Sequence, residues 1–264
     1  MMKAAIICNR EQDCSGYANQ LTAALRRLGI DSAPFPTAPC DVIIAIGGDG
    51  TLIHAAKQAA FLGVGVLGVN TGRLGYMTGL EIGELSALSR LKTGAYSVEE
   101  RMLLRVTACC GESRTDYYAM NDAVLSKGAL SRMIDITVKV NEADELQYRA
   151  DGLIAATPTG STAYTLSAGG PVLDPSTDNI LITPICPHSL FARSIVLAGD
   201  TRLEVSAAAR QGSKAFLTID GEEAVELSPD IKVQISKAPG LRAQLIKIKA
   251  DSFLQVLNQK LVER

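Results

Sequence analysis

Residues 47–51 read Gly-Gly-Asp-Gly-Thr and directly follow the apolar run 43–46. This order predicts a buried strand, a tight turn and then a helix over residues 52–61. Asp49 is the only carboxylate in the turn. It could serve as a general base, or it could simply cap the turn, and its spacing alone favours neither role.

The three glycines of this turn lack a Cβ, so their backbone can adopt positive φ and approach a ligand closely. Backbone N–H groups at the start of a helix face outward, and the helix dipole adds a partial positive charge there. The turn is therefore a candidate phosphate-binding loop, formed by Gly47, Gly48, Gly50 and Thr51.

Residues 149–171 form the densest polar and glycine-rich stretch in the chain. Its hydroxyls and backbone amides suit a polar ligand of nucleotide size. Tyr164 could stack on a base, and Asp151 could accept hydrogen bonds from an amide or an exocyclic amine. A long connection between strands, rich in turn-forming residues, accounts for the same composition equally well.

Asn121 and Asp122 follow the expected strand 117–120. An amide beside a carboxylate can grip a ribose diol or an adenine edge, although such pairs are also ordinary turn residues. His54 lies one helical turn after Gly50, where it could face a ligand or remain a solvated helix residue.

The elements expected around these residues begin with three apolar strands over 3–9, 42–46 and 64–69. Helical patterns separate the strands, and this alternation predicts a parallel sheet covered by helices. Such sheets bind ligands at the carboxyl ends of their strands. A second glycine-spaced turn, 70–75, follows the third strand, so both turns are expected to share one crevice. Pro34, Pro36 and Pro39 predict an exposed connection.

The pattern changes near residue 98 to a series of short strands with Gly, Asn, Asp and Pro between them. Over 134–140 apolar and polar residues alternate, which is typical of a half-exposed strand. We expect an all-β domain over 98–249. The apolar stripe of Phe253, Leu254, Leu257 and Leu261 predicts a terminal helix that returns to the first domain, which would then comprise 1–97 and 250–264.

Composition narrows the classes of function. The chain has 264 residues, 47% of them hydrophobic, and a formal net charge of -2, so neither nucleic acid nor an anionic membrane is favoured as a general partner. No apolar run reaches the length of a membrane span, and no signal peptide is recognised. Six cysteines and two histidines are scattered without metal-ligand spacing. We expect reduced cysteines, a cytoplasmic location and no metal site built from the protein.

Taken together, these motifs resemble the NAD kinase family. The turn at 47–51, the pair at 121–122, the run 151–171 and the stretch 183–190 fall in the family's order and at similar spacing. Lipid kinases of the diacylglycerol and sphingosine type, and with variation phosphofructokinases, carry similar Gly-Gly-Asp-Gly-Thr turns. The run Thr-Pro-Thr-Gly-Ser-Thr-Ala-Tyr at 157–164 distinguishes the NAD kinases from them.

The resemblance implies an α/β first domain, an all-β second domain and an active site in the cleft between them. It implies transfer of the γ-phosphoryl of ATP to the 2′-hydroxyl of the adenosine ribose of NAD, with Mg²⁺ accompanying ATP. It also implies a homodimer or homotetramer. By motif match Asp49 is the catalytic carboxylate. The implied NAD contacts are Asp49, Gly50, His54, Asn121, Asp122, Arg132, Arg149, Asp151, Thr162, Ala163, Tyr164, Thr165, Leu166 and Ser167.

The chain departs from the family's pattern at Asp122, where many members carry Glu. The shorter side chain of aspartate changes how far this implied NAD contact can reach. No motif decides between NAD and NADH, or between ATP and polyphosphate. Two alternatives stand beside the kinase. A lipid kinase would share the turn at 47–51 but would need an apolar acyl pocket. A dinucleotide sensor would use the same residues without catalysis.

Overall fold

The structure is a computed structural model that describes residues 1–8, 14–36, 39–72, 75–77, 79–128, 132–189, 192–208, 214–228, 231–249 and 251–262. The chain divides into two compact units. Unit 1 comprises residues 1–101 and 242–264, and unit 2 comprises residues 102–241.

Unit 1 contains the parallel sheet that the alternating pattern predicts. Its strands run β4-β3-β1-β2, all parallel, with β5 and the last part of β17 also paired with β4. The central strand β3 (Val42–Ile46) is buried throughout, as expected of a parallel strand covered on both faces. The other strands are β1 (Lys3–Cys8), β2 (Asp31–Pro34), β4 (Gly65–Asn70) and β5 (Leu80–Glu81).

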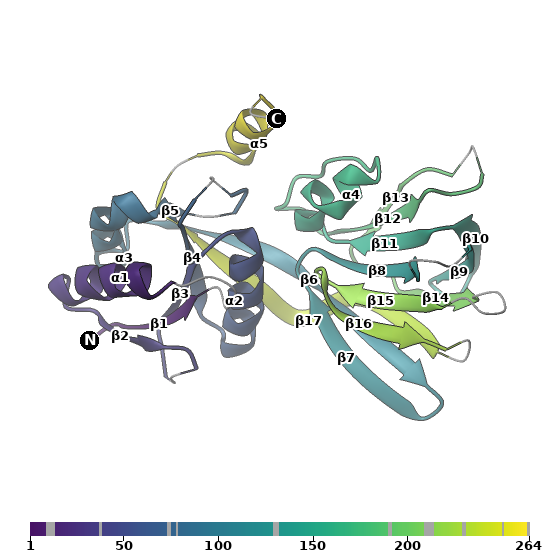
Figure 1. Ribbon diagram of the computed structural model, residues 1–264, viewed down its shortest axis with the longest axis horizontal. Coiled ribbons are helices and arrows are strands. Elements are labelled where there is room, and N and C mark those ends of the chain that lie inside the picture. The colour runs from purple at the N-terminus through teal and green to yellow at the C-terminus, as the bar shows by residue number, and fades with distance from the viewer. Residues whose placement is uncertain are drawn as a thin grey trace. The chain divides into compact units, whose positions relative to one another are not determined.

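Helices cover both faces of this sheet (Figure 1). Leu21 and Leu25 of α1 (Ser15–Arg27) pack in the same buried cluster as Ile44 of β3. α2 (Asp49–Leu62) lies against the other face and buries a row of alanines. Two short helices, η1 (Ile82–Leu88) and α3 (Ser89–Thr93), occupy the region where residues 86–91 predict one helix.

The strand β2 corrects the expectation of a plain connection around Pro34. β2 pairs in parallel with β1 only, at the edge of the sheet. An edge strand can accommodate proline because one side of it needs no ladder hydrogen bond. Periodicity gave no sign of this strand because its two inner residues are half-buried and its two outer ones exposed, without alternation.

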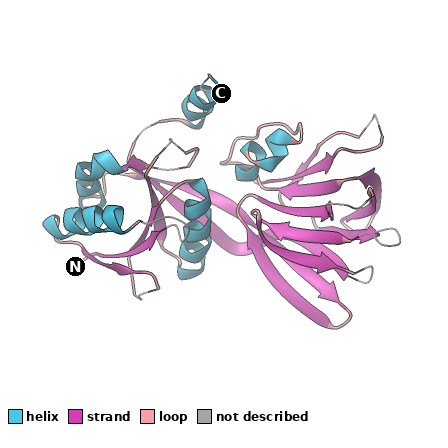
Figure 2. Cartoon of the chain, in the orientation of Figure 1, coloured by secondary structure: helices cyan, strands magenta, loops and turns pink. Residues whose placement is uncertain are grey.

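Unit 2 is built almost wholly of antiparallel strands, and its helical turns lie in one stretch (Figure 2). Its strands form two sets, β10-β9-β14-β17-β6-β7 and β13-β12-β11-β8-β15-β16. The bounds are β6 (Ser97–Cys110), β7 (Ser113–Ala119), β8 (Asp122–Lys127), β9 (Ile134–Val140), β10 (Asp144–Ala150), β11 (Gly152–Ala156), β12 (Asn179–Ile185), β13 (Ile195–Ala198), β14 (Leu203–Ala208), β15 (Ala215–Ile219), β16 (Glu222–Leu227) and β17 (Ile231–Lys247).

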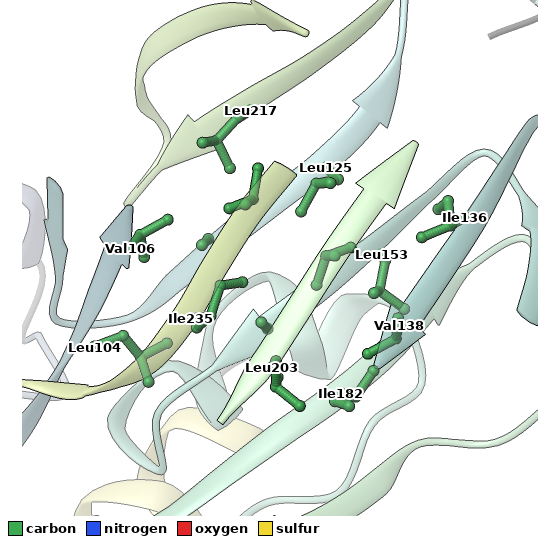
Figure 3. Packing of buried hydrophobic residues seen from close by; sticks show 14 of the residues in the cluster. Leu104, Val106, Leu125, Ile136, Val138, Leu153, Ile182, Leu203, Leu217 and Ile235 are labelled. Carbon is green, nitrogen blue, oxygen red and sulfur yellow. The ribbon is translucent and has the colours of Figure 1, made fainter. Parts of the chain in front are cut away.

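The core of unit 2 lies between these two sets of strands. Val138 and Leu203 from the first set and Leu125 and Leu153 from the second belong to one buried cluster (Figure 3). Alternate residues of each strand point into this cluster, which is the arrangement of a β-sandwich. The strands hold the connections at their ends in fixed positions, and the polar segments lie on those connections.

The chain passes between the two units within strands rather than in loops. The change from unit 1 to unit 2 falls after Arg101, inside β6, and the change back falls before Arg242, inside β17. The sequence pattern predicts these boundaries at 97/98 and 249/250, which lie four residues before the first and eight residues after the second. The terminal helix α5 (Phe253–Val262) belongs to unit 1, and the ammonium of Lys260 lies 5.8 Å from the centre of the Tyr76 ring.

Candidate functional site

The carboxylate of Asp49 is held at the carboxyl end of β3. Asp49 is the first residue of α2, and its two carboxylate oxygens accept hydrogen bonds from two consecutive backbone N–H groups. The N–H of Tyr76 donates to Oδ2 at 2.8 Å, and the N–H of Met77 donates to Oδ1 at 3.2 Å. The side chain is thus fixed by the segment that follows β4, while each oxygen keeps a second lone pair for a further donor.

Gly75 leaves room for this carboxylate. A Cβ at position 75 would lie only 2.8 Å from Cγ of Asp49 and would overlap Oδ1. The sequence predicts a glycine turn over 70–75, and the structure gives a steric reason for its last glycine. Arg73 and Leu74 of that turn lie outside the described residues.

The three glycines of the 47–51 turn differ in backbone conformation and in the space that a Cβ would have. Of the three, Gly47 alone uses the freedom that a missing Cβ gives, with φ of +150°. Gly48 is the N-cap of α2, and no side chain caps the helix there. Gly48 and Gly50 are exposed, and a Cβ at either would meet nothing within 4 Å. The N–H groups of the first turn, including that of Thr51, therefore receive no side-chain cap and are available as hydrogen-bond donors.

In unit 2, Asn121 and Asp122 are organised by a residue that the sequence did not single out. The carboxylate of Asp220 accepts hydrogen bonds from the N–H groups of Met120 at 3.0 Å, Asn121 at 2.7 Å and Asp122 at 3.1 Å. Asp220 occupies the turn between β15 and β16 with φ of +51°. An Asp-Gly pair at 220–221 is an ordinary hairpin signal, so its type and spacing did not point to a site.

The turn after β11 packs directly on this segment. Oγ1 of Thr157 donates to the carbonyl of Met120 at 2.6 Å, and the N–H of Thr157 donates to the carbonyl of Asn121 at 2.8 Å. A Cβ at Gly160 would lie 2.8 Å from Cα of Asn121. The expectation of one long polar region over 149–171 is refined here: its residues form β11, the turn η2 (Thr159–Thr162) and the short helix α4 (Tyr164–Ser167).

Three buried polar atoms in this cluster have no hydrogen-bond partner among the described residues. They are Oδ1 of Asn121, Oγ1 of Thr159 and Oγ1 of Thr165. A buried polar atom without a partner is costly, and a ligand group that forms a hydrogen bond with it removes that cost. An amide oxygen and two hydroxyls of this kind suit a ligand that carries N–H or O–H groups.

Arg149 and Asp151 lie at the other end of β11 from this cluster. Asp122 pairs with Ala156, whereas Ser126 pairs with Gly152, so the two groups lie at opposite ends of a five-residue strand, about 13 Å apart along it. Asp151 forms an ion pair with Nζ of Lys127 at 3.1 Å. Arg149 is exposed and lines a pocket of about 510 Å³ together with residues of β9, β10 and the segment 187–189.

The remaining predicted residues are placed as follows. His54 is half-buried on α2, on the same helix as Asp49, and Arg132 is exposed just before β9. Tyr164 is 46% exposed, so its ring is open to a stacking partner. The rest of α4 and its N-terminal neighbours vary in exposure, with Thr165 buried, Thr162, Ala163 and Leu166 half-buried, and Ser167 exposed.

Burial, with the nearby Asp220 carboxylate adding to it, raises the pKa of Asp122 to about 7. In an unfolded chain an aspartate titrates near pH 4. Between about pH 4 and pH 7 the unfolded chain therefore loses a proton that the folded protein keeps, so stability falls as the pH rises through this window. The shift of about three pKa units sets an upper limit on the order of 4 kcal/mol for the loss.

We expect Asp122→Asn to remove most of this pH dependence. Urea unfolding of the wild type at pH 5 and pH 8 should show a loss of stability at pH 8 that the variant lacks. The variant Asp144→Asn, on exposed β10, is the matched control and should follow the wild type. Equal pH dependence in the wild type and Asp122→Asn would contradict the burial of a protonated carboxyl.

Among the described residues no group of three or more His, Cys, Asp or Glu side chains could hold a metal ion. In the same part of the chain, no helix has the length and hydropathy needed to cross a membrane. All six cysteines lie in described positions and are free thiols.

Unit 1 is a parallel α/β unit with a fixed carboxylate at the carboxyl ends of its strands. Unit 2 is a β-sandwich with unpaired buried polar atoms. Together these features are those of a nucleotide-binding class of protein. Residues 8–96 match the family model of the ATP-NAD kinase N-terminal domain, and residues 120–248 match that of the ATP-NAD kinase C-terminal domain. The chain belongs to the NAD kinase family.

Individual relatives agree with this assignment. The NAD kinase of Symbiobacterium thermophilum is 46% identical over 256 residues, which cover 94% of this chain and 90% of the relative. The NAD kinase of Moorella thermoacetica is 42% identical over 222 residues, covering 84% and 71%. An NAD kinase from Archaeoglobus fulgidus, solved in complex with ATP, superposes with a TM-score of 0.78 at 25% identity over 100% of both chains. Yeast NADH kinase, solved with NADH, shares the fold with a TM-score of 0.86 at 20% identity, covering 99% of this chain and 88% of that one.

Proposed function

We propose that this protein is an NAD kinase that transfers the γ-phosphoryl of ATP to the 2′-hydroxyl of the adenosine ribose of NAD, giving NADP and ADP. The observation that carries the proposal is the Asp49 carboxylate, held by two backbone N–H groups at the carboxyl end of a parallel strand in a chain of this family. A carboxylate fixed in this way is oriented toward one direction and does not need to be ordered during the reaction.

Asp49 acts as the general base. A ribose hydroxyl is a weak nucleophile at neutral pH, and a carboxylate within hydrogen-bond reach orients it and accepts its proton as the new bond forms. The ribose oxygen bonds to the γ-phosphorus, the bond from that phosphorus to the β–γ bridging oxygen breaks, and ADP leaves. The N–H groups of Tyr76 and Met77 keep the carboxylate of Asp49 aimed while this occurs.

The turn before α2 binds phosphate. The exposed backbone of Gly48 and Gly50, and the N–H groups of the first helical turn with no side-chain cap, provide donors for phosphate oxygens. Gly47 and Thr51 complete this loop. ATP enters as its Mg²⁺ complex, and the ion neutralises charge on the phosphates.

The dinucleotide is bound by the polar residues that match the family's NAD-binding motifs. The unpaired Oδ1 of Asn121 offers an acceptor to a ribose or an adenine edge, and the carboxyl of Asp122, whose pKa is raised to about 7, can also donate while it is protonated. Tyr164 stacks on a ring of the ligand. The other proposed contacts are Gly50, His54, Arg132, Arg149, Asp151, Thr162, Ala163, Thr165, Leu166 and Ser167.

A coupled assay of NADP formation on the purified protein tests the proposal. With MgATP and NAD we expect turnover, and with MgATP and diacylglycerol we expect none. Calorimetric NAD binding without NADP formation would instead identify a dinucleotide sensor. Labelled phosphate on diacylglycerol would identify a lipid kinase. Separate reactions with NADH and with polyphosphate determine the preferred acceptor and donor.

We further propose a homo-oligomer in the cytoplasm. Free thiols are the form in which cysteines persist in a reducing compartment. Sedimentation measurements that give a monomer at micromolar concentration would contradict the assembly.

A further inference from the structure

Lys247, at the end of β17, is half-buried, although nothing in the sequence marked it as functional. Its ammonium Nζ donates a hydrogen bond to the backbone carbonyl of Met77 at 3.1 Å. Met77 is the residue whose N–H donates to Oδ1 of Asp49. The backbone of Met77 is therefore held at both its N–H and its carbonyl. The N–H is bound by Asp49 of α2 and the carbonyl by Lys247 of β17, two elements that are distant in the sequence.

The position of Lys247 is itself firmly fixed. Gln244 and Leu245 of the same strand pair in parallel with the start of β4, which places the end of β17 inside the sheet of unit 1. Leu245 and Ile246 are buried. The direction in which the Lys247 side chain leaves the strand is therefore defined. Its ammonium binds the backbone of the 75–77 segment at the carbonyl of Met77.

The groups around Lys247 shift its pKa in opposite directions. Burial lowers the pKa of Lys247, while the carboxylates of Glu99, Asp49 and Asp251 favour its charged form and the guanidinium of Arg101 opposes it. Arg101 is nearly fully buried and forms its own ion pair with Glu99 at 2.5 Å. A well-packed apolar side chain would fill the same volume without the cost of removing a charge from water. What the ammonium contributes beyond packing is its hydrogen bond to the carbonyl of Met77.

We propose that Lys247 is a positioning residue for the catalytic carboxylate, which it holds in place through Met77. The inference rests on the proposed role of Asp49 as the general base. Lys247 fixes the carbonyl of Met77, and the N–H of Met77 in turn fixes Oδ1 of Asp49. Without the ammonium the 75–77 segment loses one of its anchors, and the carboxylate samples directions that do not reach the ribose hydroxyl.

The test is Lys247→Met, which keeps the length of the apolar stem and removes the ammonium. We expect kcat to fall at least about tenfold, since small misplacements of a catalytic group have effects of this size. KM for NAD and for ATP should stay within about twofold of the wild type. Lys247→Arg, which keeps a cation at the same place, should recover a large part of the lost turnover.

Lys249→Met is the matched control. It removes the same charge two residues further along, from a lysine whose ammonium pairs with Glu84 at 2.6 Å and makes no contact with the 75–77 segment among the described interactions. We expect kcat of this variant to equal that of the wild type. Thermal unfolding of all variants ensures that each assay is run on folded protein.

A double-mutant cycle separates positioning from a general structural effect. In an Asp49→Asn background, Lys247→Met should cause no further loss, because the carboxylate that it positions is already absent. An equal loss in both backgrounds would overturn the proposal, and so would near-normal turnover of Lys247→Met beside an impaired Asp49→Asn. Near-normal turnover of Asp49→Asn itself would instead overturn the base assignment.

Discussion

Asp49→Asn is expected to lower kcat by roughly 10²- to 10⁴-fold, the range that loss of a general base produces. Asparagine keeps the size of the side chain and one carbonyl acceptor, but it cannot accept the proton of the ribose hydroxyl. NAD binding should stay close to that of the wild type, since most of the proposed dinucleotide contacts lie elsewhere in the chain. Turnover is measured as NADP formation and binding by calorimetry.

One structural consequence of this substitution needs a control. The amide NH₂ of the new side chain faces one of the two backbone N–H groups that now donate to Asp49, so a small loss of stability is expected. Asp41→Asn also removes a carboxylate that accepts a backbone N–H, here from Lys3 at 2.7 Å. If Asp41→Asn retains turnover and Asp49→Asn loses it, the effect is chemical. Turnover within a few-fold of the wild type in Asp49→Asn would sink the base assignment.

Gly75→Ala is expected to have the second largest effect. The added methyl group would overlap the carboxylate of Asp49, whose oxygens are held by Tyr76 and Met77 and cannot swing away without losing those hydrogen bonds. We expect kcat to fall by roughly 10²-fold, because displacement of a catalytic group by about 1 Å has a cost of this order. The melting temperature should change little, since the clash falls on one side chain rather than on the core.

Gly72→Ala is the control for the same segment. A Cβ at Gly72 would meet nothing within 4 Å, and the hydrogen bond from its N–H to Oδ1 of Asn70 is kept. We therefore expect wild-type turnover from Gly72→Ala. A Gly75→Ala protein with turnover within about twofold of the wild type would show that the carboxylate does not need its observed position.

Asp49→Asn and Gly75→Ala together separate two properties of the catalytic carboxylate. The first removes its basicity and leaves its place nearly unchanged, whereas the second keeps its basicity and moves it. A comparable loss in both would mean that the position of the carboxylate matters as much as its charge. That result is expected of phosphoryl transfer, in which positioning supplies much of the rate enhancement.

The parts of the fold that could be predicted are those with a strong local pattern. The apolar run ending at Ile46 is β3, and the helix after it is α2, which begins three residues earlier than expected, at Asp49. The alternation over 134–140 is β9, with its apolar residues mostly buried. In these segments neighbouring residues alone carry the signal, because the period of side-chain burial follows from the geometry of one strand or one helix.

Not every strand was recognised from the sequence. The edge strand β2 exists because β1 offers it a free row of hydrogen-bonding groups, and the proline-rich sequence gives no hint of that partner. β10, over 144–150, does alternate, with Leu146, Tyr148 and Ala150 between polar residues, but it was not predicted; it pairs with β9. Strand pairing is a property of two segments together, so a single segment with weak propensity does not reveal it.

The sequence by itself determined the residue types that the proposed chemistry needs, namely a carboxylate among glycines at Asp49 and a polar run that ends near Tyr164. The tertiary structure decided what holds them. Asp49 receives its hydrogen bonds from residues 27 and 28 positions away, Asn121 is capped by a carboxylate 99 positions away, and Met77 is held by an ammonium 170 positions away. Spacing along the chain predicts local geometry only. These contacts form between strands and turns that are distant in the sequence, and no local pattern predicts which of them become neighbours.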